Sequence, residues 1–122
     1  MEDKIRVVVC KPDEEAYITE IDNTLQAMQD LVGGCIQTIH PWKLNATLVC
    51  NEEGFIKSFA CNRIVCGEPI FGTFFICWED GDEFASLDEK LAKGLRHTYG
   101  KAPRPLHMAN TLLHLLWGGH EV

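Results

Sequence analysis

Cysteine and histidine are the residue types of this chain most able to do chemistry, so their spacing is considered first. Most of the six cysteines, Cys10, Cys35, Cys50 and Cys77, fall in or beside apolar runs that predict β-strands. A free cysteine in such a run is most often a small buried hydrophobe. We therefore expect these side chains to belong to the core.

Cys61 and Cys66 are the pair that comes nearest to a metal motif. They are five positions apart, which is not the spacing of a zinc knuckle. They could still supply two ligands, with His107, His114 or His120 completing a zinc site. Core packing is the favoured interpretation, and we expect no metal and no cofactor.

No pattern of nucleophile and base predicts an enzyme. Ser58 and Ser86 are the only serines, and no Gly-x-Ser-x-Gly motif is present. His40 could approach Cys35 or Cys50, but no spacing requires it. The adjacent carboxylates fall in predicted turns, where they are solvated and not tuned for acid–base work. We expect a protein without catalytic activity.

A small set of polar and aromatic residues is the candidate for ligand or partner binding: Trp42, Asn51, Asn62 and Arg63. A tryptophan close to the surface can stack on a base or anchor a protein contact. The Asn62-Arg63 pair offers donors for a phosphate, a carboxylate or a backbone. The alternatives are a surface ion pair for Arg63 and a turn for Asn51.

Composition limits the partners of the chain. Its 122 residues are 46% hydrophobic and 24% charged, which is typical of one globular domain. The net charge of −7 argues against direct binding to nucleic acid or to an anionic membrane. No run of about 18 apolar residues predicts a membrane span, and the acidic residues 1–4 do not resemble a signal peptide. We expect a cytoplasmic protein.

Alternating or continuous apolar runs predict the strands. The run 4–9 is nearly continuous, so we expect a central strand, and 17–21 is expected to pair back on it. The turn 51–54 places Gly54 where a positive φ is needed, with 55–59 returning as a strand. The other predicted strands are 35–40, 47–50 and 73–78.

Capping signals and leucine spacing predict the helices. Asn23 and Gln26 have the spacing of a capping box, and Gly33 is expected to end the first helix. Ser86 and Glu89 have the same spacing before a second helix. Its predicted buried stripe is Leu87, Leu91 and Leu95, and its predicted end is Gly100.

A leucine-rich segment near the C-terminus predicts a last helix from about Pro105 to Trp117. Its apolar face is wider than a surface helix needs. We divide the chain into a single α+β domain, 1–100, and a helical extension, 101–122, that packs on it or on a partner. Leu112, Leu116 and Trp117 are the candidates for self-association, with a homodimer as one outcome.

The fold class is therefore α+β. We expect a mainly antiparallel sheet of about five strands, with one early helix and two C-terminal helices packed on it.

The order of these blocks resembles a known family. The segments 4–9, 17–21, 31–36, 48–54, 62–63, 72–76 and 84–87 together are similar to the family catalogued as domain of unknown function 3846. The resemblance covers roughly residues 4–99. It implies a genomic context of phages and conjugative elements of gut bacteria, whose accessory genes often encode proteins that blunt host defences. It implies no enzymatic role.

These observations together predict a non-catalytic binding protein of a phage or mobile element. We expect counter-defence by occupying a host immune protein or complex in the bacterial cytoplasm, where an acidic surface could cover a basic groove. One alternative is a sponge for a nucleotide signal, with Trp42, Asn62 and Arg63 as contacts. Another is a structural or housekeeping protein of the element with no role in defence.

Overall fold

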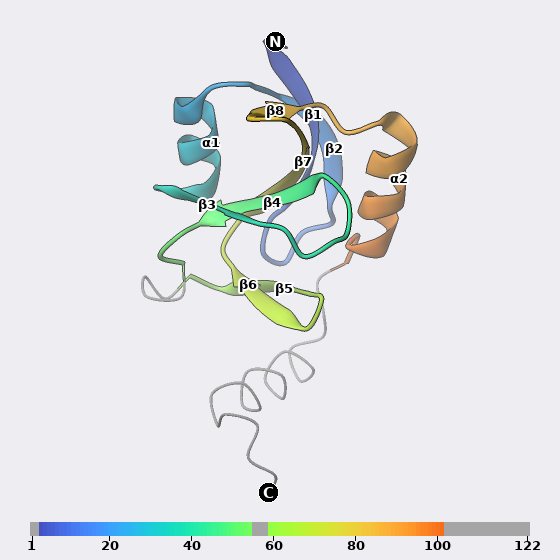
Figure 1. Cartoon of the computed structure of the whole chain (residues 1–122). Helices are drawn as coiled ribbons and strands as arrows, with labels where there is room; N and C mark the ends of the chain where they lie inside the picture. The colour runs from blue at the N-terminus through green and yellow to red at the C-terminus, as the bar shows by residue number, and fades with distance from the viewer. Residues whose placement is uncertain (1–2, 55–58, 102–122) are drawn as a thin grey trace, which may run out of the picture.

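The computed structural model describes residues 3–54 and 59–101 of the chain (Figure 1). Its helices are α1 (Leu25–Val32) and α2 (Glu89–Thr98). Its strands are β1 (Lys4–Cys10), β2 (Tyr17–Asp22), β3 (Ile36–Ile39), β4 (Ala46–Asn51), β5 (Cys61–Val65), β6 (Glu68–Phe71), β7 (Phe74–Asp80) and β8 (Glu83–Ala85).

One antiparallel sheet forms the body of the fold. Its strands lie in the order β2-β1-β7-β4-β3, and β8 pairs with β7. β5 and β6 form a separate two-stranded hairpin. The predicted return of 17–21 onto the first strand is confirmed, with Val7 opposite Thr19. The first strand is an inner strand of the sheet, as predicted.

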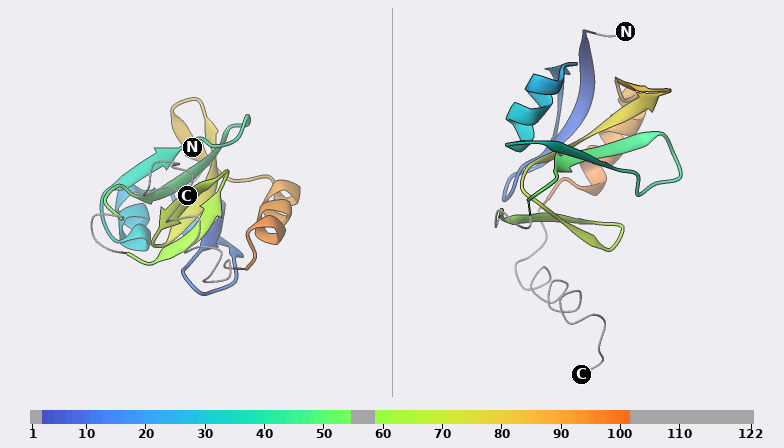
Figure 2. Two further views of the ribbon diagram at one scale, coloured as in Figure 1. Left: turned by 90° about the horizontal axis from the view of Figure 1, so that it is seen from below. Right: turned by 60° about the vertical axis from the view of Figure 1, so that its left-hand side comes forward.

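Both faces of the sheet are covered, which explains its continuous apolar strands. α1 lies on one face, over a cluster that includes Val7, Met28 and Phe75. α2 and the β5–β6 hairpin lie on the other, over a cluster that includes Phe74 and Ile76. Figures 1 and 2 show the two helices on opposite sides of the sheet and the hairpin across one end.

Both helices form where predicted, but their caps differ by a residue or two from the prediction. The Thr24 side chain, not that of Asn23, caps α1 by accepting from the backbone N–H of Ala27. Asp88, not Ser86, caps α2, because its carboxylate accepts from two N–H groups of the first turn. The Ser86 hydroxyl instead accepts from the backbone N–H of Arg6, which fastens the loop to β1.

The helix ends follow the same physical logic. Gly33 ends α1 in the left-handed conformation, at φ 83°, as expected. α2 ends at Thr98, with Tyr99 as its C-cap, so the helix stops just before the predicted end at Gly100. The predicted stripe of α2 is confirmed: Leu87 is buried, and Leu91 and Leu95 pack on the same core cluster.

The sheet prediction needs two corrections. The described residues form eight strands where about five were expected, because no strand was predicted at β5, β6 or β8. Gly54 has no positive φ. A Cβ there would lie 2.7 Å from the carbonyl oxygen of Phe71, so close approach explains the glycine.

The remaining predicted elements lie partly or wholly outside the described residues. Of the predicted strand 55–59, only Phe59 is described, and it is not in a strand. The predicted last helix falls within 102–122, so the described chain has two helices and not three. Neither helix in the described part of the chain is long and apolar enough to cross a membrane.

Candidate functional site

The Arg63 side chain is the most unusual polar group in the fold. It lies in β5 and is 1% exposed. Its Nε donates to the carbonyl oxygen of Tyr99 at 2.9 Å. Its Nη1 and Nη2 donate to the carbonyl oxygens of Lys11 at 3.4 Å and of Glu14 at 2.5 Å. The guanidinium is therefore surrounded by neutral backbone oxygens.

Asn62 completes this buried polar cluster. Its Nδ2 donates to the carbonyl oxygens of Cys10 at 2.7 Å and of Gly72 at 2.9 Å. Its Oδ1 accepts from Arg63 Nη1 at 2.5 Å. Together, Asn62 and Arg63 tie the β5–β6 hairpin to the end of β1, to the following loop and to the end of α2.

These contacts change the interpretation of the predicted pair. Asn62 is 0% exposed, so a ligand would reach either side chain only by opening the fold. Burial lowers the pKa of Arg63, although a guanidinium stays charged in proteins. The alternative of a surface ion pair for Arg63 is wrong, because the side chain is buried among carbonyls. Its geometry favours a structural role.

Asn51 is also a structural residue in this fold. Its Nδ2 donates to the carbonyl oxygen of Val32, the last residue of α1, at 3.3 Å. Its Oδ1 accepts from the backbone N–H of Glu53 at 2.8 Å, which is the geometry of an Asx turn. The turn alternative for Asn51 is confirmed.

Trp42 and Asn51 lie on opposite faces of the sheet. Trp42 is half-buried and packs on the core cluster under α2. Its ring is 6.3 Å from that of Tyr99, at a tilt of 60°. The structure thus brings Asn62 and Arg63 together, links Trp42 to them through Tyr99, and leaves Asn51 on the opposite side of the sheet with α1.

A groove between the sheet and the β5–β6 hairpin was not predicted. One hollow, of about 300 Å3, has walls of Ile39, Leu48, Val65 and Ile70 and a polar end at His40. A second, of about 260 Å3, shares Ile39 and Ile70 and extends along β6. β3 and β6 belong to different sheets and meet only because the hairpin packs on one face of the large sheet, so no local sequence signal could have found the groove.

The turn of the hairpin places a thiol at the rim of this groove. Cys66 and Gly67 have φ values of 50° and 84°, the sign pattern of a type I′ turn. Cys66 Sγ lies 3.6 Å from the carbonyl oxygen of Pro41. His40, the next residue back, pairs with Glu79 through Nε2 at 3.0 Å. The side chains of Cys66 and His40 are exposed and that of Glu79 is half-buried, so this rim is open to solvent.

The cysteines divide by burial. All six are free, and Cys10, Cys50 and Cys77 are buried, as expected. Burial raises the pKa of Cys10 and of Cys50 to about 11, and that of Cys77 to about 12. Cys35 and Cys66 are exposed, so the expectation that they lie in the core is wrong. The described residues hold no cluster of three or more metal-ligating side chains, and the three histidines of the zinc alternative lie outside them.

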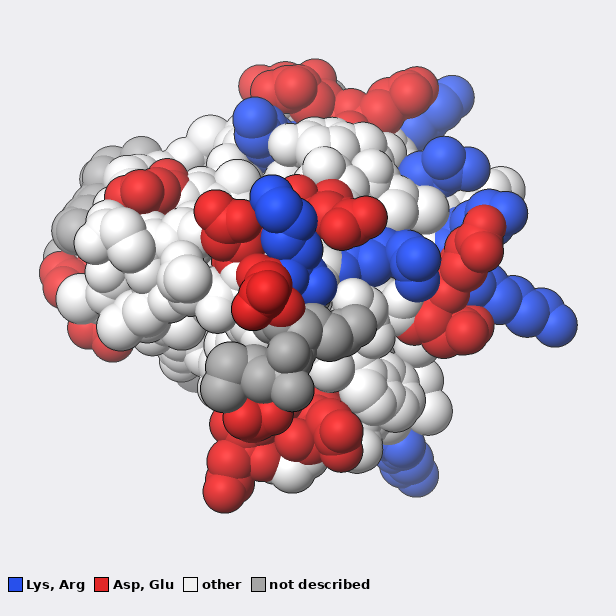
Figure 3. Space-filling model, turned by 90° about the horizontal axis from the view of Figure 1, so that it is seen from above, with Lys and Arg blue, Asp and Glu red and all other residues white. Residues whose placement is uncertain are grey.

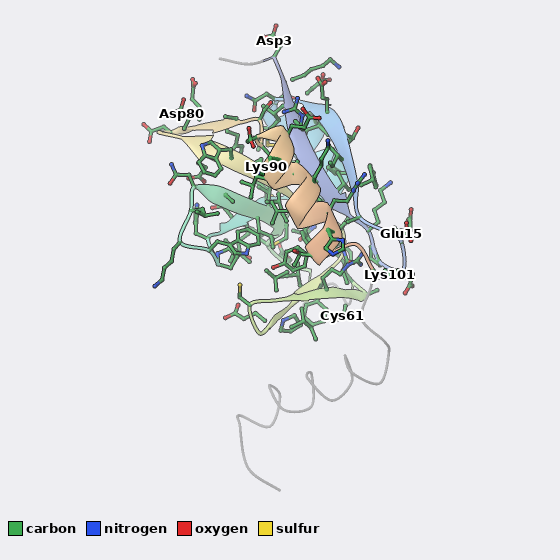
Figure 4. The ribbon with its side chains drawn as sticks, turned by 90° about the vertical axis from the view of Figure 1, so that its right-hand side faces the viewer. Asp3, Glu15, Cys61, Asp80, Lys90 and Lys101 are labelled. Atoms are coloured by element: carbon green, nitrogen blue, oxygen red, sulfur yellow. The ribbon has the colours of Figure 1, made fainter. Side chains whose placement is uncertain are left out.

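Charge is distributed unevenly over the surface. The hairpin of β7 and β8 carries Glu79, Asp80, Asp82 and Glu83, and the last three are exposed. Figure 4 shows Asp80 at the end of this hairpin, away from the body of the sheet. Figure 3 shows Lys and Arg gathered mainly on the side of the molecule where α2 lies.

A third hollow lies at the C-terminal end of α2. It measures about 700 Å3, and its lining includes Glu15, Tyr17, Arg96, His97 and Lys101. Figure 4 shows Glu15 and Lys101 at the same corner of the molecule. The candidates for self-association, Leu112, Leu116 and Trp117, lie outside the described residues.

The fold and these sites define a small α+β protein: an antiparallel sheet with one helix on each face, its buried polar side chains fixed by the backbone. A family model matches residues 5–100, and the family is described as Domain of unknown function (DUF3846). The chain belongs to this family. No curated protein and no solved structure shows a significant match to this chain.

Proposed function

We propose that the protein is a non-catalytic accessory binding protein of a phage or mobile element. It opposes host defence by occupying a host immune protein or complex in the bacterial cytoplasm. The observation that carries the proposal is the acidic β7–β8 hairpin, with Asp80, Asp82 and Glu83 exposed at its end. A dense group of carboxylates is complementary to a basic surface on a protein partner.

The interior supports binding over catalysis. The strongest donors of the predicted set, Asn62 and Arg63, bond to backbone carbonyls. Buried thiols have raised pKa values, which disfavours the thiolate needed for nucleophilic attack. Catalysis on a small substrate would need polar donors or thiolates that line an accessible cavity.

Capture of a partner from extracts of the bacterial host tests the proposal. The wild-type chain should retain a defence protein at a fixed stoichiometry, and the purified partner should lose activity when the chain is added. Neutralising the hairpin with Asp80→Asn, Asp82→Asn and Glu83→Gln should weaken capture at least about tenfold. A matched control is Glu15→Gln, Glu20→Gln and Glu53→Gln, which removes as much charge elsewhere and should bind normally.

A nucleotide sponge is the second candidate function, and one observation favours it. Arg96, His97 and Lys101 line the hollow at the end of α2 with Tyr17, a set suited to an anionic ring-bearing ligand. This site replaces the predicted contacts at Asn62 and Arg63. Retention of a nucleotide by the purified protein, without any protein partner, would favour the sponge over the proposal above.

A further inference from the structure

We propose that the outer edge of β3, which faces away from β4, is a docking site for an extended segment of a partner protein. The segment would add to the sheet as a further strand and send alternate side chains into the groove beside β6. This inference rests on the proposed function, because it names the kind of contact through which a protein partner is held. Figure 1 shows β3 at one margin of the sheet, above the β5–β6 hairpin.

The register identifies the backbone groups at this edge. The backbone N–H of Glu52 donates to the carbonyl oxygen of Cys35 at 3.0 Å. In an antiparallel ladder, hydrogen-bonded pairs alternate with pairs whose polar groups point outward. Since Ile36 is opposite Asn51 and Thr38 opposite Val49, the N–H and C=O groups of Ile36 and Thr38 point away from β4.

Within the described residues, no strand lies along this edge. Proteins commonly protect a sheet edge with charges or proline. β3 reads Ile-Gln-Thr-Ile and has neither. The opposite edge strand, β2, carries Glu20 and Asp22, and the hairpin strand β6 carries Pro69. Of these three strands, β3 is therefore the one best suited to accept another strand at its edge.

The groove gives this edge a side-chain specificity. Gln37 and Ile39 line it from β3, and Ile70 lines it from β6. A strand added beside β3 would place every second side chain on this face of the sheet. Its two hollows, of about 300 and 260 Å3, are each large enough for an aliphatic side chain.

The acidic rim of the groove favours a partner segment that carries positive charge. Glu52 and Glu68 lie on the rim of the groove, and both are exposed. The segment that fits is extended, has aliphatic residues at alternate positions, and carries a Lys or Arg beside them.

A displayed library of random peptides, each about 12 residues long, tests the inference without host proteins. Selection on the wild-type chain should enrich peptides with aliphatic residues at alternate positions and a neighbouring basic residue. An enriched synthetic peptide should slow hydrogen exchange at the amides of Ile36 and Thr38. It should bind Thr38→Pro at least about tenfold more weakly, because proline removes an outward N–H. Thr38→Val keeps that N–H and should bind normally.

Three results would overturn the inference: no enrichment, equal binding to Thr38→Pro and Thr38→Val, or a dimer whose own β3 amides are protected. The exchange measurement uses the wild-type chain, so it decides the question even if Thr38→Pro does not fold. If host extracts yield a partner that Thr38→Pro binds normally, the proposed function stands and only the β3 site fails. If peptides bind at β3 and no host protein is captured, the proposed function fails instead.

Discussion

Arg63 Nε donates to the carbonyl oxygen of Tyr99 at 2.9 Å, and this bond joins the β5–β6 hairpin to the end of α2. The last carbonyls of a helix have no partner within it. Here the guanidinium supplies one, while its Nη2 holds the loop at Glu14. A strand, a loop and a helix end thus share one buried cation.

Replacing Arg63 should destabilise the fold strongly. Arg63→Lys keeps the charge but cannot reach all the carbonyls, so we expect the free energy of unfolding to fall by about 2–4 kcal/mol. Chemical denaturation followed by circular dichroism measures it. Arg96→Lys, at an exposed position on α2, is the matched control and should change stability by less than about 0.5 kcal/mol. A similar small change for Arg63→Lys would show that the buried cluster is unimportant.

Trp42 should behave as a packing residue and not as a ligand contact. Its ring packs on the core beside Tyr99, so Trp42→Ala should cost about 2 kcal/mol of unfolding free energy. Trp42→Phe retains much of the contact and should cost less than half as much. A Trp42→Ala variant of unchanged melting temperature that loses a ligand would restore the sequence-based interpretation.

Thiol labelling should follow the burial of the cysteines. At pH 8 the exposed Cys35 and Cys66 should react quickly with a disulfide reagent. Cys10, Cys50 and Cys77 should react only when the protein unfolds, because burial blocks access and raises their pKa values. Mass spectrometry of digested protein identifies the labelled sites. Fast labelling of Cys77 in the native protein would contradict the structure.

Stability should fall in alkaline solution. On folding, the thiol pKa rises from 9.0 to about 11 at Cys10 and to about 12 at Cys77. As the pH increases, these thiols therefore lose their protons at a lower pH in the unfolded chain than in the folded one. The stabilising contribution is complete below pH 9 and is lost as the pH rises through 11 and 12. Unfolding free energies measured between pH 8 and 11 should therefore decline.

Cys77→Ala serves as the control for this pH effect. Its stability should be lower at pH 8 because of the cavity, but its decline with pH should be shallower than that of the wild-type chain. An identical slope in both proteins would assign the alkaline sensitivity to other groups.

Much of the fold could be predicted from local patterns. The run at β1, the aromatic run at β7 and the leucines of α2 each have a period or composition that one kind of element requires. The caps were misplaced because neighbouring residues, Asn23 and Thr24, can both accept from the first turn. The order of the strands depends on long-range pairing, which no local pattern records.

The candidate site was harder to predict for a related reason. An Asn-Arg pair is usually exposed, so its burial could not be inferred without knowing that β5 crosses the end of β1. For Asn51, by contrast, the alternative of a turn role followed from its own side-chain chemistry, which acts over two residues. The groove lies between β3 and β6, which are about 30 residues apart in sequence, and only the packing of the hairpin on the sheet brings them together.

The most direct test of the proposed function is native mass spectrometry of the chain purified from bacterial cells, the host that the proposal assigns to it. It reports any bound protein, nucleotide or metal and the number of copies in one measurement. The proposal predicts a complex with a host defence protein at fixed stoichiometry, which dissociates when the β7–β8 hairpin is neutralised. A chain that carries a nucleotide and no protein partner would contradict it.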